Sequence, residues 1–362
     1  NQATGSLSLD IDTTAPGSEH QVQGELGEEG RYTSAVLVSI SAIDAGSGVQ
    51  EIRFRLNGGA WTAYSSAVAL AEDGVHLLEY YGADRAGNAG PVTRVEVLID
   101  SHGPGVSIIP DRQPSSHDWF DGPVVITLGS VDHFDQGCPV YFRWEGDAWG
   151  EYSSPLEISA EGTHLLECYA VDLAGNQGEV MERTFRLDLV QPTCSAEVSG
   201  TLGLNGIYVS EVQVTIAAQD QVSGVAAIRL RMNSGAWTVA DGGVAVTAQG
   251  LTVIEFYAVD RAGNAGPVGS VSMDIDTEAP SVLAVADLPS RGGWHASGVN
   301  VTLSPDEEGC AVLYRLGSGD WAEYGTSIAI HGHGLTLLEF YAVDRAGNQG
   351  PLQVMELRLD LI

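Results

Sequence analysis

An eight-residue signature, Tyr-(Gly/Ala)-(Ala/Val)-Asp-x-Ala-Gly-Asn, occurs four times along this chain. Its last residues are Asn88, Asn176, Asn264 and Asn348, so the copies are 88, 88 and 84 residues apart. A period of this length indicates an array of small domains rather than one large core. A chain of near-copies suits reach, spacing or assembly better than chemistry at a single site.

The period divides the 362 residues into four domains of about 88 residues, the size of one β-sandwich. Each repeat opens on an aspartate, and each linker then reaches a proline, which cannot donate to a sheet ladder. The linkers at residues 12–16 and 276–280 are clear, and those at 100–104 and 188–192 are looser versions of them. The predicted boundaries are 12–99 for repeat 1, 100–187 for repeat 2, 188–275 for repeat 3 and 276–362 for repeat 4, with residues 1–11 ahead of them.

Strand patterns recur inside every repeat. Residues 36–42 alternate apolar and polar side chains, which is typical of a half-buried strand, and so do residues 94–99 at the end of repeat 1. The dipeptide Asn57-Gly58 is a hairpin signal between them. About seven short strands per repeat, with no sustained helical period, predict an all-β fold: a tandem array of four immunoglobulin-like β-sandwich domains.

Residues 6–11 match the closing strand of a repeat but precede the first one. They form either an orphan closing strand, cut with this segment from a longer repeat protein, or a strand that inserts into another subunit by β-strand addition. The chain starts at Asn1 without methionine or a signal peptide, which favours a processed product or an excised piece.

The chain is strongly acidic. It carries 48 acidic and 16 basic residues, a formal net charge of −32, and every basic residue is arginine. Such a chain repels nucleic acid and anionic membranes and attracts cations, although solubility alone would also explain the charge. No apolar run approaches the roughly 18 residues of a membrane span, so no membrane insertion is expected. Without lysine, a Lys–Asn isopeptide cross-link cannot form within this segment.

The four cysteines, Cys138, Cys168, Cys194 and Cys310, are not distributed as one pair per repeat. They therefore define no shared disulfide framework, and a Cys138–Cys168 bridge inside repeat 2 is the one pairing considered. No Cys-x-x-Cys or close histidine pair supports zinc.

Several of these marks together resemble the bacterial Ig-like and fibronectin-III-like repeats of large secreted and cell-surface proteins. They are the linker Asp-Thr-x-Ala-Pro, the tripeptide Ser-Gly-Val at residues 47–49 and 223–225, a tryptophan after the hairpin, and the signature. The resemblance covers nearly the whole chain. It implies the sandwich fold and a role in a stalk, an adhesin arm or a spacer. The loops around Cys138 and Cys310 depart from Ser-Gly-Val.

Three aspartates recur in each repeat and form the sharpest candidate site. The linker aspartates are Asp12, Asp100, Asp188 and Asp276; the loop aspartates are Asp44, Asp132, Asp220 and Asp306; the signature aspartates are Asp84, Asp172, Asp260 and Asp344. In a sandwich these segments share the pole that faces the previous domain. Three carboxylates and the oxygen of the signature asparagine suit Ca²⁺, which takes 6–8 oxygen ligands. The alternative is turn chemistry, in which Asp and Asn bind nearby backbone N–H groups.

Two sets of aromatic residues also recur. The hairpin tryptophans Trp61, Trp149, Trp237 and Trp321 could stack on carbohydrate, but their regular recurrence favours core or edge packing. A second set, assigned to one structural position, is Tyr32, Phe120, Tyr208 and Trp294.

No constellation unique to one repeat provides a pre-organised catalytic site, so we expect no enzyme here. The expected function is a structural repeat segment of an extracellular stalk, fibre or adhesin, acting by end-to-end stacking and by strand sharing through residues 6–11. Its partners would be itself or neighbouring repeats. The alternative is a ligand-binding or spacer module of a secreted multimodular enzyme.

Overall fold

The computed structural model describes residues 7–361. Within that range the chain is all-β, as predicted, with 28 strands and two short 3₁₀ turns, Glu28–Gly30 and Leu204–Gly206. Neither turn, nor any other part of the described range, provides a helix with the length and apolarity needed to cross a membrane. Of the predicted orphan strand, Ser6 lies outside the described residues, and Leu7–Ile11 form no strand.

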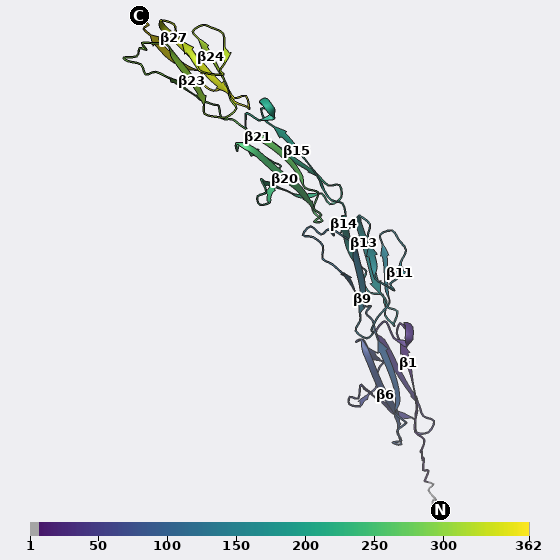
Figure 1. The fold of residues 1–362 in the computed structure, drawn as a ribbon. Helices are drawn as coiled ribbons and strands as arrows, with labels where there is room; N and C mark the ends of the chain where they lie inside the picture. The colour runs from purple at the N-terminus through teal and green to yellow at the C-terminus, as the bar shows by residue number, and fades with distance from the viewer. Residues whose placement is uncertain (1–6, 362) are drawn as a thin grey trace, which may run out of the picture. The chain divides into compact units, whose positions relative to one another are not determined.

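Repeat 1 is a two-layered sandwich of seven antiparallel strands (Figure 1). One sheet has the order β1-β2-β5, and the other has the order β4-β3-β6-β7. The strand bounds are β1 Gly17–Gln23, β2 Val36–Ile43, β3 Val49–Leu56, β4 Thr62–Ala63, β5 Val68–Leu70, β6 Gly74–Asp84 and β7 Thr93–Ile99. This three-plus-four Greek-key arrangement is an immunoglobulin-like sandwich.

The other repeats have the same strand order in both sheets. Repeat 2 contains β8 Gly105–Pro110, β9 Val124–Val131, β10 Val140–Trp144, β11 Gly150–Glu151, β12 Leu156–Ile158, β13 Gly162–Ala170 and β14 Met181–Leu187. Repeat 3 contains β15 Thr193–Ser199, β16 Val212–Gln219, β17 Val225–Met232, β18 Thr238–Ala240, β19 Gly243–Val246, β20 Gly250–Asp260 and β21 Gly269–Ile275. Repeat 4 contains β22 Val282–Ala286, β23 Val299–Pro305, β24 Ala311–Leu316, β25 Ala322–Glu323, β26 Ile328–Ile330, β27 Gly334–Val343 and β28 Gln353–Leu359.

The core of each sandwich follows from the alternation in its strands. On β2, Val36, Val38 and Ile40 face inward and are buried, while the residues between them are exposed. They meet Leu78 and Tyr80 of β6 in the opposite sheet. Repeats 3 and 4 contain corresponding buried clusters, and repeat 2 buries the equivalent residues Val124, Ile126 and Leu166. Each fully buried aliphatic side chain contributes roughly 1.5–3 kcal/mol to the stability of its sandwich.

The chain divides into two compact units. The first comprises Asn1–Pro114 and Gly122–Leu187, and the second comprises Ser115–Asp121 and Asp188–Ile362. Repeats 1 and 3 share a 3₁₀ turn whose central residue is left-handed, Glu29 (φ 51°) or Asn205 (φ 54°). The described parts of repeats 2 and 4 contain no such turn. The sequence therefore repeats as a pair of two different sandwiches.

The Cys138–Cys168 bridge considered from the sequence is wrong, because both residues are free thiols. Cys168 points into the core from β13, opposite Phe142 of β10. Continued to Cys138, the same register faces a position four residues beyond Cys168, about 13 Å along the strand. Burial raises the pKa of the Cys168 thiol to about 11.

Candidate functional site

The signature loop is held together by its own aspartate and asparagine. In repeat 1 the Asp84 carboxylate accepts the backbone N–H groups of Ala86 and Asn88 at 2.9 and 2.8 Å. The Asn88 amide nitrogen donates to Asp84 at 2.7 Å and to the carbonyl of Asp12 at 3.1 Å. Gly87 adopts φ +95°, which favours glycine. Asparagine thus ties the linker to the loop through its nitrogen.

The same asparagine contact recurs in every repeat. The side-chain amides of Asn176, Asn264 and Asn348 donate to the linker carbonyls of Asp100, Asp188 and Asp276 at 2.7–2.8 Å. The asparagine oxygen was predicted as a metal ligand. The nitrogen of the same side chain already donates hydrogen bonds to the linker carbonyl and to the signature aspartate.

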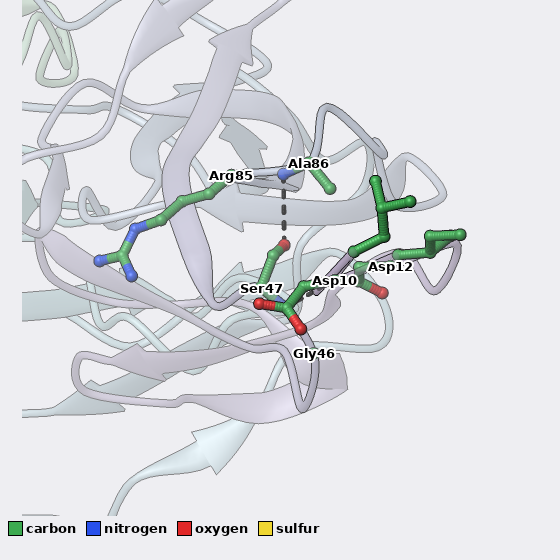
Figure 2. Close-up of a pocket in the computed structure, with 8 residues that line it drawn as sticks. Asp10, Asp12, Gly46, Ser47, Arg85 and Ala86 are labelled. Atoms are coloured by element: carbon green, nitrogen blue, oxygen red, sulfur yellow. Dashed lines mark hydrogen bonds between the residues drawn. The ribbon is translucent and has the colours of Figure 1, made fainter. Parts of the chain in front are cut away.

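The serine of Ser-Gly-Val joins the linker to the signature loop. The Ser47 N–H donates to the Asp12 carboxylate at 2.6 Å, and its hydroxyl accepts the Ala86 N–H at 3.2 Å (Figure 2). Ser223 makes the same two contacts in repeat 3, at 2.9 and 3.3 Å. The serine of Ser-Gly-Val therefore connects its own loop to the linker and to the signature loop, a role that the sequence did not reveal.

In repeats 1 and 3 the three predicted aspartates come together. Oxygens of Asp12, Asp44 and Asp84 lie within 4.8 Å of one another. The same holds in repeat 3 for Asp188, Asp220 and Asp260. One buried oxygen of Asp44, and one of Asp220, has no hydrogen-bond partner. Among the described residues Arg85 and Arg261, which follow the signature aspartates, form no ion pair.

Repeat 4 differs from the prediction in one ligand. The group there is Asp276, Glu307 and Asp344, and the predicted Asp306 is replaced by its neighbour. Both oxygens of Asp306 are bound to Ser281, through its N–H at 2.8 Å and its hydroxyl at 2.7 Å. Burial, together with the charges of Asp276 and Asp344, raises the pKa of Glu307.

Repeat 2 departs further, because its pole already holds a cation. Arg31 of repeat 1 donates to Asp100 at 3.2 Å and binds both oxygens of Asp135 at 2.9 Å. Asp172 is buried at the same pole, and Asp132 forms a group with Asp135 and Cys138 that does not include Asp100. Burial raises the pKa of the Cys138 thiol, so it remains protonated and does not suit Ca²⁺.

The poles are also where neighbouring repeats meet within each unit. In the first unit the N–H of Glu28, in the 3₁₀ turn of repeat 1, donates to the carbonyl of Ala174 at 2.9 Å. In the second unit the N–H of Leu204 donates to the carbonyl of Ala346 at 2.7 Å. Both acceptors are the alanine of Ala-Gly-Asn and are buried, whereas the corresponding Ala86 of repeat 1 is exposed.

A glycine makes this close approach possible. A Cβ on Gly27 or Gly203, the residue before each turn, would lie 2.2 Å from the alanine carbonyl oxygen of the next repeat. Neither the turn glycine nor the contact to Ala-Gly-Asn was recognised from the sequence. The recurrence of Gly-x-x-Gly at 27–30 and 203–206 is the signal that could have shown it.

The hairpin tryptophans pack on the four-stranded sheet, as expected. Trp61 meets Tyr81 of the signature edge-on, with ring centroids 4.8 Å apart, and Arg55 lies 4.7 Å over the indole. Arg55 also pairs with Glu79 on the neighbouring strand. The other three copies are Arg143, Glu167 and Trp149; Arg231, Glu255 and Trp237; and Arg315, Glu339 and Trp321.

One aromatic assignment from the sequence was wrong. Tyr32 bridges to the closing strand and accepts the N–H of Asp100, and the equivalent contact in repeat 4 joins His295 to Asp360. His295, not Trp294, is therefore the structural counterpart of Tyr32. Trp294 is 45% exposed and occupies the position of Arg31.

No protein family matches the sequence, and no curated protein matches it. Three of the similar solved structures are fibronectin(III)-like modules of Clostridium thermocellum CbhA, a 1.5-MDa bacterial ice-binding adhesin, and the D00-D0 domain of intimin. Their identities are 15%, 15% and 10%, and their TM-scores are 0.29, 0.31 and 0.25. The matches cover 47%, 71% and 45% of this chain and 94%, 99% and 98% of those chains. The fold assignment rests on strand order and register rather than on these matches.

Proposed function

We propose that this chain is a non-catalytic structural segment of an extracellular stalk, fibre or adhesin. Its repeats would stack pole to pole, so that the chain sets a distance rather than performing a reaction. The observation that supports this most is the repeated docking contact. The turn before Arg31 binds Ala174, and the turn before Ile207 binds Ala346, in the same way in both units.

We further propose that Ca²⁺ stiffens the poles that have no cation of their own. Carboxylate oxygens are hard ligands, and a group of three offers three to six of the oxygens that Ca²⁺ needs. The unpartnered buried oxygens of Asp44 and Asp220 support this, because an unsatisfied buried acceptor is costly. The residues that would hold the ions are Asp12, Asp44 and Asp84; Asp188, Asp220 and Asp260; and Asp276, Glu307 and Asp344.

Strand sharing through the N-terminal segment remains a separate proposal. Leu7, Leu9 and Ile11 are all more than 70% exposed, and Asp10 lies between two of them. Alternating apolar side chains of this kind suit the closing strand of a sandwich. We propose that the segment pairs with a sheet of another domain or subunit.

Small-angle scattering in calcium and then in chelator tests the proposed function. Calcium should give the profile of a stiff particle, because bound ions restrict movement at the poles. Chelator should give the plateau of a flexible chain at high angle in a normalised Kratky plot. A flexible profile in both conditions would contradict a structural stack, and a stiff profile in both would remove the role of calcium.

A further inference from the structure

The guanidinium of Arg31, in repeat 1, forms a buried ion-pair network with two carboxylates of repeat 2. Its side chain is 14% exposed, and the side chains of Asp100 and Asp135 are 1% and 5% exposed. Binding to both oxygens of one carboxylate fixes the direction of the guanidinium as well as its charge. Asp135 also accepts the N–H of Leu173, so the network reaches the signature loop.

The repeat that receives Arg31 is also the one that lacks an arginine in its own signature loop. The residue after the signature aspartate is arginine in three repeats, Arg85, Arg261 and Arg345, and is Leu173 in repeat 2. The residue that corresponds to Arg31 in repeat 3 is Ile207, next to Tyr208. Thus repeat 2 lacks its own loop arginine and receives a guanidinium from the preceding repeat, whereas repeat 4 has Arg345 and faces Ile207.

We infer that Arg31 is a built-in cation, which holds the junction of repeats 1 and 2 without a metal ion. Among the described residues, the junction of repeats 3 and 4 receives no guanidinium from the preceding repeat, and under the proposed function the group Asp276, Glu307 and Asp344 would take Ca²⁺ instead. The contrast with the second junction rests on the proposed calcium sites. The ion pairs of Arg31 with Asp100 and Asp135, which we call the Arg31 clasp, do not depend on those sites. With Asp100, Asp135 and Asp172 all buried at one pole, a permanent guanidinium supplies the counter-charge that a divalent ion would otherwise bring.

Two double variants of the full chain exchange the residues of the junctions. Arg31→Ile with Leu173→Arg gives the first junction the pattern of the second, and Ile207→Arg with Arg345→Leu does the reverse. Both exchanges leave the net charge unchanged, so a change in long-range attraction for cations is controlled. Thermal unfolding of each variant verifies that the sandwiches fold.

The readout is amide hydrogen exchange at two equivalent N–H groups, those of Glu28 and Leu204, measured by NMR in chelator and in calcium. In the wild type we expect the Glu28 amide to be protected at least tenfold more than Leu204 in chelator, and calcium to slow only Leu204. The first variant should lose the protection of Glu28 in chelator and recover it in calcium. The second variant should protect Leu204 in chelator.

The possible results separate this inference from the calcium proposal. If calcium slows neither amide but the first variant still loses protection of Glu28, the calcium sites fail and the clasp stands. If Glu28 exchanges equally in wild type and first variant in chelator, Arg31 is not a clasp. Equal slowing of Glu28 and Leu204 by calcium in the wild type would also overturn the inference.

Discussion

At the residue scale, a glycine two positions after each signature asparagine lets two segments touch. A Cβ on Gly178 would lie 1.9 Å from the carbonyl oxygen of Pro104, the linker residue that enters the first strand. The corresponding distances are 2.4 Å for Gly90, 2.2 Å for Gly266 and 2.0 Å for Gly350, each to the equivalent proline. The signature therefore extends to Asn-x-Gly, and its glycine serves the contact between linker and loop.

Gly178→Ala should destabilise the first unit by about 1–3 kcal/mol, because the added methyl group forces the linker and the loop apart. Chemical denaturation of the full chain measures the loss. The control is Gly150→Ala, where a Cβ meets nothing within 4 Å. Equal stability of the two variants would show that the linker moves aside without cost.

His102 and Asp73 predict a pH dependence at the linker after repeat 1. Their side chains are 2.6 Å apart, and the hydrogen bond and charge of Asp73 raise the pKa of His102. Burial opposes ionisation of Asp73, but hydrogen bonds from Ser101 and His102 outweigh it and lower its pKa. The contribution of His102 to folding stability is complete below about pH 6.5 and is lost as pH rises through its raised pKa. The contribution of Asp73 to folding stability is present above about pH 3.8 and is lost as pH falls through its lowered pKa.

An NMR titration checks this pair directly. The pKa of His102 should exceed 6.5, and Asp73→Asn should bring it back toward that value because the negative partner is gone. A His102 pKa that does not respond to the substitution would mean that the two side chains do not interact in solution.

At the scale of the strand, an arginine, a glutamate and a tryptophan contact one another at the equivalent position of every four-stranded sheet. Arg143 of β10 lies directly opposite Glu167 of β13 in the register, and its guanidinium covers Trp149. A cross-strand pair of opposite charge stabilises a sheet locally, and stacking on indole orients the arginine. The repetition of this trio on four sandwiches indicates a role in holding the exposed face of the sheet.

Arg143→Met should raise the pKa of Glu167, because the hydrogen bond from Arg143 is the main cause of its lowered value. The lowered pKa means that the contribution of Glu167 to stability is present above about pH 4.5 and is lost as pH falls through the folded value. Carboxylate NMR of Glu167 measures the shift, with the exposed Arg186→Met as the matched control. An unchanged titration of Glu167 in Arg143→Met would contradict the pairing.

The strands and the poles were predictable because their signals are local. The alternation at residues 36–42 defines β2, whose observed span is Val36–Ile43. The triads of repeats 1 and 3 follow from sandwich topology alone. The choice of Glu307 over Asp306 was not predictable, because it depends on which of two adjacent side chains turns toward the pole. Arg31 was missed because its partners lie 69 and 104 residues away.

At the scale of the whole molecule, two units each contain a pair of unlike sandwiches joined by the same turn-to-loop contact. The poles differ in charge compensation, since one holds Arg31 and three present carboxylate groups that no arginine bridges within residues 7–361. Under the proposed function, a chain with a net charge of −32 would attract divalent cations to these poles. Stiffness would then vary along the chain with the calcium concentration.

The proposed calcium sites can be counted by titration calorimetry of the full chain with Ca²⁺. We expect three sites, one for each carboxylate group in repeats 1, 3 and 4. Asp44→Asn, Asp220→Asn and Glu307→Gln should each remove one site, whereas Asp147→Asn, on an exposed hairpin, should remove none. Free Ca²⁺ at about 100 times its dissociation constant should raise the free energy of unfolding by about 2.7 kcal/mol per site. No binding by the wild type, or three sites retained in all the variants, would show that these carboxylate groups do not bind Ca²⁺.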